Sequence, residues 1–128
     1  MKFIHLSPGG TPEAIELEKI GLADLQHYVE GYVESPYVPG LNEQGIVLWA
    51  NEEGPIHQMR PNLLIEHSSL FEPMLIVGPV VFTSLDDDTG ETTGLTDEQV
   101  EKVKTFVDQA RMTFPKALRA GLVKIKRV

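Results

Sequence analysis

The sequence predicts an α+β fold, with a mainly antiparallel sheet of about four to six strands, one short helix and one long C-terminal helix. Three observations lead to this prediction. Several short segments, either alternating or continuously apolar, are bounded by turn residues, as strands are. A segment around residue 25 has apolar residues at helical spacing, and a strong helix-capping signal precedes an amphipathic stretch near residue 100.

The first two strands are predicted to form a hairpin. Lys2–Leu6 is followed by a Ser-Pro-Gly-Gly turn, and residues 14–18 then alternate apolar with acidic side chains. The next strands are expected at residues 32–34 and 45–50, on either side of a connection that contains prolines and a glycine.

A single central strand is predicted at Leu75–Phe82, because this stretch is rich in β-branched residues and apolar on both faces. Gly78 and Pro79 inside it predict a bulge or bend. The segment 55–73 has mixed polarity and three prolines, so it is expected to be irregular, with a short strand or helical turn around residues 63–65.

Two helices are predicted. Apolar residues between Leu22 and Val29 repeat at helical spacing, and Gly31 follows where a helix C-cap favours a residue tolerant of positive φ. The long helix should begin at Asp97, behind a capping box that starts at Thr96, and Pro115 should stop or kink it.

Composition favours one soluble domain over residues 1–114, with a basic extension over residues 115–128. The chain has no cysteine, which excludes disulfides and thiolate metal sites and fits a reducing cytoplasm. Its apolar stretches are far shorter than the roughly 20 residues of a membrane span, and no signal-peptide pattern opens it. We therefore expect a cytoplasmic protein without membrane contact.

The net charge of −8 conceals an asymmetry. Residues 1–110 carry nineteen acidic and five basic residues, whereas residues 111–128 carry six basic residues and no acid. An acidic body argues against nonspecific nucleic-acid binding, which needs clustered cations. The cations of the tail are the predicted partner-binding residues, which either dock on the acidic surface of a second subunit or contact the phosphates of a partner: Lys116, Arg119, Lys124, Lys126 and Arg127.

Several short signatures fall in one order along the chain, including Arg60-Pro61-Asn62, Ile76-Val77-Gly78-Pro79 and Gly94-Leu95-Thr96-Asp97-Glu98. This series resembles the domain of unknown function 3846 over roughly residues 1–110. The resemblance implies a bacteriophage accessory protein that works inside a host bacterial cell, and it supplies no catalytic residues. The segment 63–73 is longer than the family's usual connection, and the basic tail lies outside the family core.

Asn51, Arg60 and Asn62 are the candidate ligand-binding residues. An arginine between two asparagines in an acidic, loop-rich body offers donors to a phosphate or carboxylate of a small anionic ligand. The alternative, which we favour from the sequence, is structural: Arg60 pairs with a nearby glutamate and the asparagines hold turns.

No catalytic, metal or cofactor site is predicted. No serine lies in a nucleophile elbow, and the histidines are scattered without metal-binding spacing. The acidic loop around Asp86–Glu91 does not match an EF-hand and is expected to be solvated. An enzyme would need a pair such as His57 with Glu52 or Glu53, which the sequence permits but does not support.

The C-terminal helix carries an apolar stripe at near-heptad spacing, although it is too short for an autonomous coiled coil. Packing on the sheet is the favoured explanation of the stripe. The alternative is a homodimer through this helix, with an interface that includes Val103, Phe106 and Phe114.

Three functional hypotheses follow. The first is a non-enzymatic phage accessory protein that binds a host protein, for example to counteract host defence. The second is a binding protein for a small molecule such as a nucleotide signal. The third is an acidic DNA mimic, which the dispersed acids support only weakly.

Overall fold

The computed structural model describes residues 1–66 and 73–119, and the side chains of those up to Arg111. Within that part the fold is α+β, as predicted. The elements are β1 (Lys2–Leu6), β2 (Glu13–Glu16), α1 (Leu22–Val29), β3 (Val33–Glu34), α2 (Pro39–Asn42), β4 (Ile46–Asn51), β5 (Pro61–Ile65), β6 (Met74–Val77), β7 (Val80–Leu85), β8 (Thr92–Thr93) and α3 (Asp97–Arg119).

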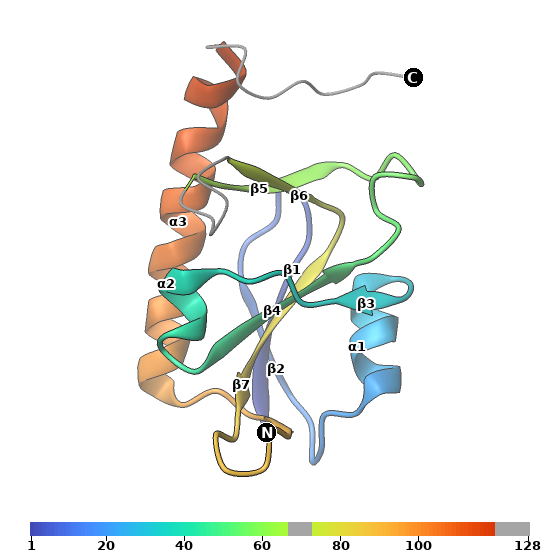
Figure 1. Ribbon diagram of the computed structural model, residues 1–128, viewed down its shortest axis with the longest axis vertical. Coiled ribbons are helices and arrows are strands. Elements are labelled where there is room, and N and C mark those ends of the chain that lie inside the picture. The colour runs from blue at the N-terminus through green and yellow to red at the C-terminus, as the bar shows by residue number, and fades with distance from the viewer. Residues whose placement is uncertain (67–72, 120–128) are drawn as a thin grey trace.

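The main sheet is antiparallel throughout and has the order β2-β1-β7-β4-β3, with β8 paired to the end of β7. The apolar strand β7 lies at its centre, where Phe82 is opposite Ile4 on one side and Leu48 on the other. Figure 1 shows α3 along one side of this sheet and α1 on the opposite side. The predicted hairpin of β1 and β2 is confirmed.

Two separate cores cover the two faces of the sheet, because successive strand residues point to opposite faces. Phe3 and Val81 pack with Leu25 and Val29 of α1 on one face. The other face holds a larger core, which α2, α3 and the β5–β6 pair cover; its residues include Ile4, Leu6, Leu48, Phe82, Leu63, Val103 and Val107.

The prediction of one strand across Leu75–Phe82 is wrong. β6 pairs with β5 in a separate two-stranded sheet, and β7 begins again at Val80 in the main sheet. Gly78 lies between them with a φ of 82°, and Pro79 has no N–H to donate to a ladder. The chain therefore changes sheets at this turn, and the short strand expected around residue 64 becomes the partner of β6.

The end of α1 differs from the prediction in one residue. Glu30, not Gly31, has the left-handed conformation, with a φ of 63°. Gly31 is needed for another reason: a Cβ on it would lie 2.6 Å from the side-chain nitrogen of Asn51. A second difference is α2, a four-residue helix in the connection between β3 and β4, where the sequence analysis predicted no helix.

The start of α3 is as predicted. The Gln99 N–H donates to Thr96 Oγ1 at 3.1 Å, and the Thr96 N–H donates to Gln99 Oε1 at 2.9 Å, which completes the capping box. Pro115 does not stop the helix, which continues to Arg119. A proline inside a helix removes one N–H bond and its ring crowds the carbonyl four residues earlier, but the residues after it favour helix.

Candidate binding groove

Asn51 is a structural residue at the end of β4. Its side-chain nitrogen donates to the carbonyl oxygens of Val29 and Glu30 at 3.0 and 3.2 Å, and its oxygen accepts the Glu53 N–H at 2.8 Å. The side chain is 3% exposed. Its two donors therefore satisfy the C-terminal carbonyls of α1 and are not available to a ligand.

Asn62 has a similar role on the other face. Its nitrogen donates to the Leu6 and Gly78 carbonyls at 2.9 and 2.8 Å, and its oxygen accepts from the Arg111 guanidinium at 3.0 Å. Arg111 also donates to the carbonyls of Ser7 and Gly10. Together the two side chains fasten β5 and the β1–β2 turn to α3.

Burial lowers the pKa of the Arg111 guanidinium, while the Asp108 carboxylate acts in the opposite direction. The sequence analysis assigned no role to Arg111. Sequence periodicity offered no signal for it, because its partners, the Ser7 and Gly10 carbonyls and the Asn62 side chain, are all far away in the sequence.

Arg60 differs from the two asparagines. Its side chain is exposed, and it makes no hydrogen bond or ion pair with any residue of the described part. The expected pairing with Glu52 or Glu53 is not formed; Glu53 instead lies 3.0 Å from His57 Nε2 in an exposed pair. The three predicted ligand-binding residues make no hydrogen bonds to one another.

The three residues of the predicted oligomer interface differ in how exposed their side chains are. Val103 is 0% exposed, so its side chain packs in the core and cannot contact a second molecule. Phe106 is only partly buried and meets Phe82 edge-on, with ring centroids 6.2 Å apart. The side chain of Phe114 lies outside the described part.

The tail predicted to bind partners lies largely outside the description. Lys116 and Arg119 belong to α3, but their side chains are not described. Lys124, Lys126 and Arg127 fall in residues 120–128, which lie outside the described residues altogether.

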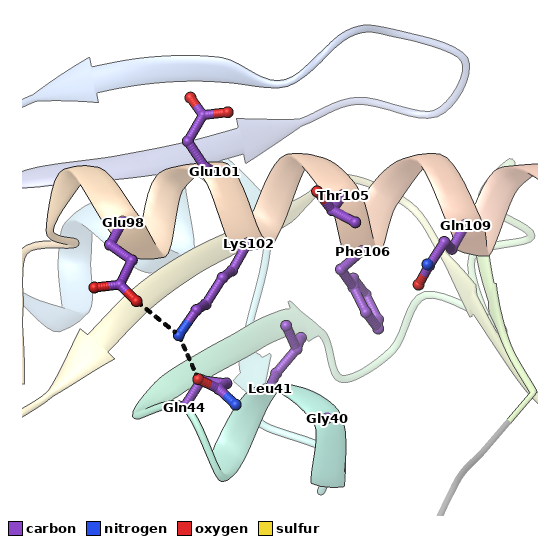
Figure 2. Close-up of a pocket in the computed structure, with 9 residues that line it drawn as sticks. All are labelled: Gly40, Leu41, Gln44, Glu98, Glu101, Lys102, Thr105, Phe106 and Gln109. Carbon is purple, nitrogen blue, oxygen red and sulfur yellow. Dashed lines mark hydrogen bonds and ion pairs between the residues drawn. The ribbon is translucent and has the colours of Figure 1, made fainter.

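A groove of about 470 Å³ runs between α2 and α3. Figure 2 shows side chains of the two helices around it, with Leu41 and Phe106 as its large apolar groups. Its lining residues are Gly40, Leu41, Gln44, Glu98, Glu101, Lys102, Thr105, Phe106 and Gln109. Such a volume is in the range of binding pockets.

Lys102 closes one end of this groove. Its ammonium donates to Gln44 Oε1 at 2.5 Å and lies 3.2 Å from Glu98 Oε1 (Figure 2). Gln99 Nε2 also donates to the Gln44 carbonyl at 3.0 Å. These contacts fix the C-terminal side of α2 against α3. The part of the groove around Phe106 stays open.

A second hollow of about 220 Å³ continues the groove toward β5. It shares Gly40, Phe106 and Gln109 with the first and adds Leu64, Ile65, Glu66 and Ala110. Glutamates outnumber the single lysine among the residues that line the two hollows. The combined surface, which we call the α2–α3 groove, is therefore apolar at its centre and acidic at its rim.

The described part contains no group of three or more histidine, aspartate or glutamate residues placed to hold a metal ion, and no helix long and apolar enough to cross a membrane. In the acidic loop the Asp86 carboxylate accepts the N–H groups of Asp88 and Thr89 at 2.9 and 3.4 Å, so this side chain organises a turn.

Comparison with known proteins gives one match. A family model described as a domain of unknown function (DUF3846) matches residues 1–108, which confirms the resemblance found in the sequence motifs. No curated protein and no solved structure matches the chain. The match includes β1 to β8 and the first half of α3, and it ends before the basic tail.

Proposed function

The chain belongs to the domain of unknown function 3846 family, and we propose that it is a non-enzymatic bacteriophage accessory protein that binds a host protein through the α2–α3 groove. The phage setting rests on the family resemblance. The observation that supports a binding role is the groove itself, with a partly exposed aromatic side chain between two helices. Counteraction of host defence is one consequence such binding would have.

Phe106 is the expected centre of the contact. Aromatic residues in a partly enclosed pocket contribute most to protein interfaces, because they bury a large apolar area with few rotatable bonds. Leu41 of α2 lines the same groove but is only 2% exposed, so Phe106 supplies most of the apolar surface, and Thr105 and Gln109 add hydroxyl and amide groups beside the ring. A partner that inserts an apolar side chain here would find apolar contacts at the centre and polar groups at the edge.

The small-molecule hypothesis has weaker support. Two of its three residues, Asn51 and Asn62, use their amide donors inside the protein. A single exposed arginine is a poor site for an anion, because specific recognition needs several converging donors.

The groove is tested by making it too small for a partner. Thr105 is exposed and lines the groove, so Thr105→Arg adds bulk and charge there without disturbing the core. Ala23→Arg is the matched control, since Ala23 is an exposed residue of α1 on the opposite face. A protein captured from a bacterial lysate is first identified and purified, and its affinity is then measured by calorimetry.

We expect Thr105→Arg to raise the Kd by about a hundredfold, which corresponds to about 2.7 kcal/mol. Ala23→Arg should leave the Kd unchanged. A captured protein that binds both variants as it binds the native chain would place the contact elsewhere, and binding lost equally in both would point to charge alone.

A further inference from the structure

We propose that two copies of this chain associate through the outer edges of β2, so that their main sheets join into one continuous antiparallel sheet. β2 is the last strand at its end of the main sheet, and no strand of the described part pairs with its outer edge. None of its residues lines the α2–α3 groove. The inference therefore goes beyond the proposed function and does not depend on it.

The hydrogen bonds beside β2 show which of its backbone groups point outward. The Leu17 N–H donates to the Met1 carbonyl at 2.9 Å, and the Met1 nitrogen donates to the Leu17 carbonyl at 2.5 Å. Because bonded pairs alternate along an antiparallel ladder, every second residue of β2, counted back from Leu17, bonds to β1. The residues between them, Ala14 and Glu16, therefore point their N–H and C=O groups to the outer edge.

These outward groups fit a second copy of the same strand. When two copies run antiparallel about a twofold axis at Ile15, Ala14 of each copy lies opposite Glu16 of the other, and both pairs can exchange two hydrogen bonds. Ile15 then faces Ile15 of the second copy, and Glu13 faces Leu17. No glutamate is opposite another glutamate, so the strand is complementary to itself in this register.

The two neighbouring registers that align outward groups are less favourable. An axis at Ala14 places Glu16 opposite Pro12, which has no N–H to donate. An axis at Glu16 places this carboxylate directly opposite its own copy, and like charges in that position destabilise a pair of strands. The acidic residues of β2 thus select one register.

The edge is accessible and held in place. Ala14 and Glu16 are exposed, and Ile15 is only half-buried against the core of the α1 face. The contacts of α1 are mainly with β3, β4 and β7, so this helix does not stand over the edge. Arg111 fastens the turn between β1 and β2 through two of its carbonyls. An edge that is already ordered loses little conformational entropy when it pairs.

The lack of cysteine in the chain allows a direct test by disulfide formation. Ile15→Cys places a thiol of each copy at the axis, where opposite residues that are not hydrogen-bonded have Cα atoms about 4.5 Å apart, which is within reach of a disulfide. Leu17→Cys is the matched control, because Leu17 is also half-buried and packs against the same core. In the proposed register its two thiols are four residues apart along the strands, about 14 Å.

Oxidised glutathione is the oxidant: the two thiols become one disulfide, and each glutathione disulfide is reduced to two glutathione molecules. We expect a covalent dimer from Ile15→Cys and about tenfold less from Leu17→Cys, since only the first pair has disulfide geometry.

Ala14→Pro tests the backbone contact without a cysteine. Proline here removes an N–H that makes no bond to β1, and proline is accepted on an edge strand when its nitrogen faces solvent. Circular dichroism should show a folded chain. By symmetry the dimer loses two hydrogen bonds. In sedimentation velocity over a concentration series, we expect the variant to remain a monomer at concentrations where the native chain is a dimer.

Three results would overturn the proposal. A native chain that is monomeric at every concentration would leave the edge to a strand of another protein. Equal disulfide formation in Ile15→Cys and Leu17→Cys would indicate random collision. A native dimer that Ala14→Pro does not weaken would associate through another surface, such as α3. Loss of partner binding in Thr105→Arg bears on none of these results, because no partner is present.

Discussion

The two faces of the central sheet are covered in different ways. On the α1 face, Tyr28 packs edge-on against Phe3 with ring centroids 5.1 Å apart, and Asn51 satisfies the carbonyls at the end of the helix. On the other face, α3 has twenty-three residues while its neighbour α2 has only four. A helix of about one turn cannot cover the length of α3. The α2–α3 groove and the partly exposed Phe106 are the result.

This comparison indicates that both faces stabilise the protein, whereas only the α3 face also leaves a groove open at the surface. The following predictions compare how much individual residues of the two faces contribute to stability.

The largest effects are expected from the two aromatic residues at the centres of the cores. Phe3 is 1% exposed on the α1 face, and Phe82 is 0% exposed on the α3 face. Replacing either by alanine should lower the free energy of unfolding by about 3–5 kcal/mol, because each change leaves a cavity. Urea denaturation measures both. A cost below about 1 kcal/mol for either residue would mean that its face is not a true core.

A somewhat smaller loss in the free energy of unfolding is expected for Asn51→Ala. The change leaves the Val29 and Glu30 carbonyls without their side-chain donor, and it should cost about 2 kcal/mol. Asn62→Ala is the counterpart on the α3 face and should cost a similar amount, since it removes two donors and an acceptor for Arg111. Chemical denaturation of both variants tests this equivalence; an Asn62 variant as stable as the native chain would contradict it.

The N-terminal caps of α3 and α1 should contribute differently to stability, because Thr96 has a capping side chain and Gly21 has none. Thr96→Ala removes the side-chain acceptor for the Gln99 N–H and should lower stability by about 1 kcal/mol. Thr96→Ser retains the hydroxyl and is the control. The thermal midpoint, measured by circular dichroism, should fall by a few degrees for the alanine variant only. Equal midpoints for alanine and serine would show that the cap contributes nothing.

The smallest expected effect is a gain in stability at the N-terminus of α1. The N-cap of α1 is Gly21, which has no side chain to offer, although Asp24 Oδ2 accepts its N–H at 2.8 Å. Its φ of −105° suits any residue. Gly21→Asn should therefore raise the free energy of unfolding by about 0.3 kcal/mol. A measured loss would indicate that the new side chain collides with its neighbours, of which Asp24 is the nearest, 3.5 Å from the expected Cβ.

Local patterns were enough to predict several elements. The β1–β2 hairpin, the first helix, the strand β4 and the capping box at Thr96 each depend on residues close together in the sequence. The two faces of the sheet also follow from alternation, because Phe3 and Ile4 must point in opposite directions. The fold class could be predicted because these signals are local.

The sequence did not determine which strands share a sheet, or what the polar residues contact. A continuous apolar run cannot show that the chain leaves one sheet at Gly78 and enters another, because both strands are apolar. From the sequence, Asn51 and Asn62 could either hold turns, the favoured explanation, or donate to a ligand, and their actual partners lie far away in the sequence. The groove likewise exists only because α2 and α3, distant in the chain, pack side by side with unequal lengths. Sequence fixes what each segment can form, whereas long-range packing decides which side chains remain exposed to a partner.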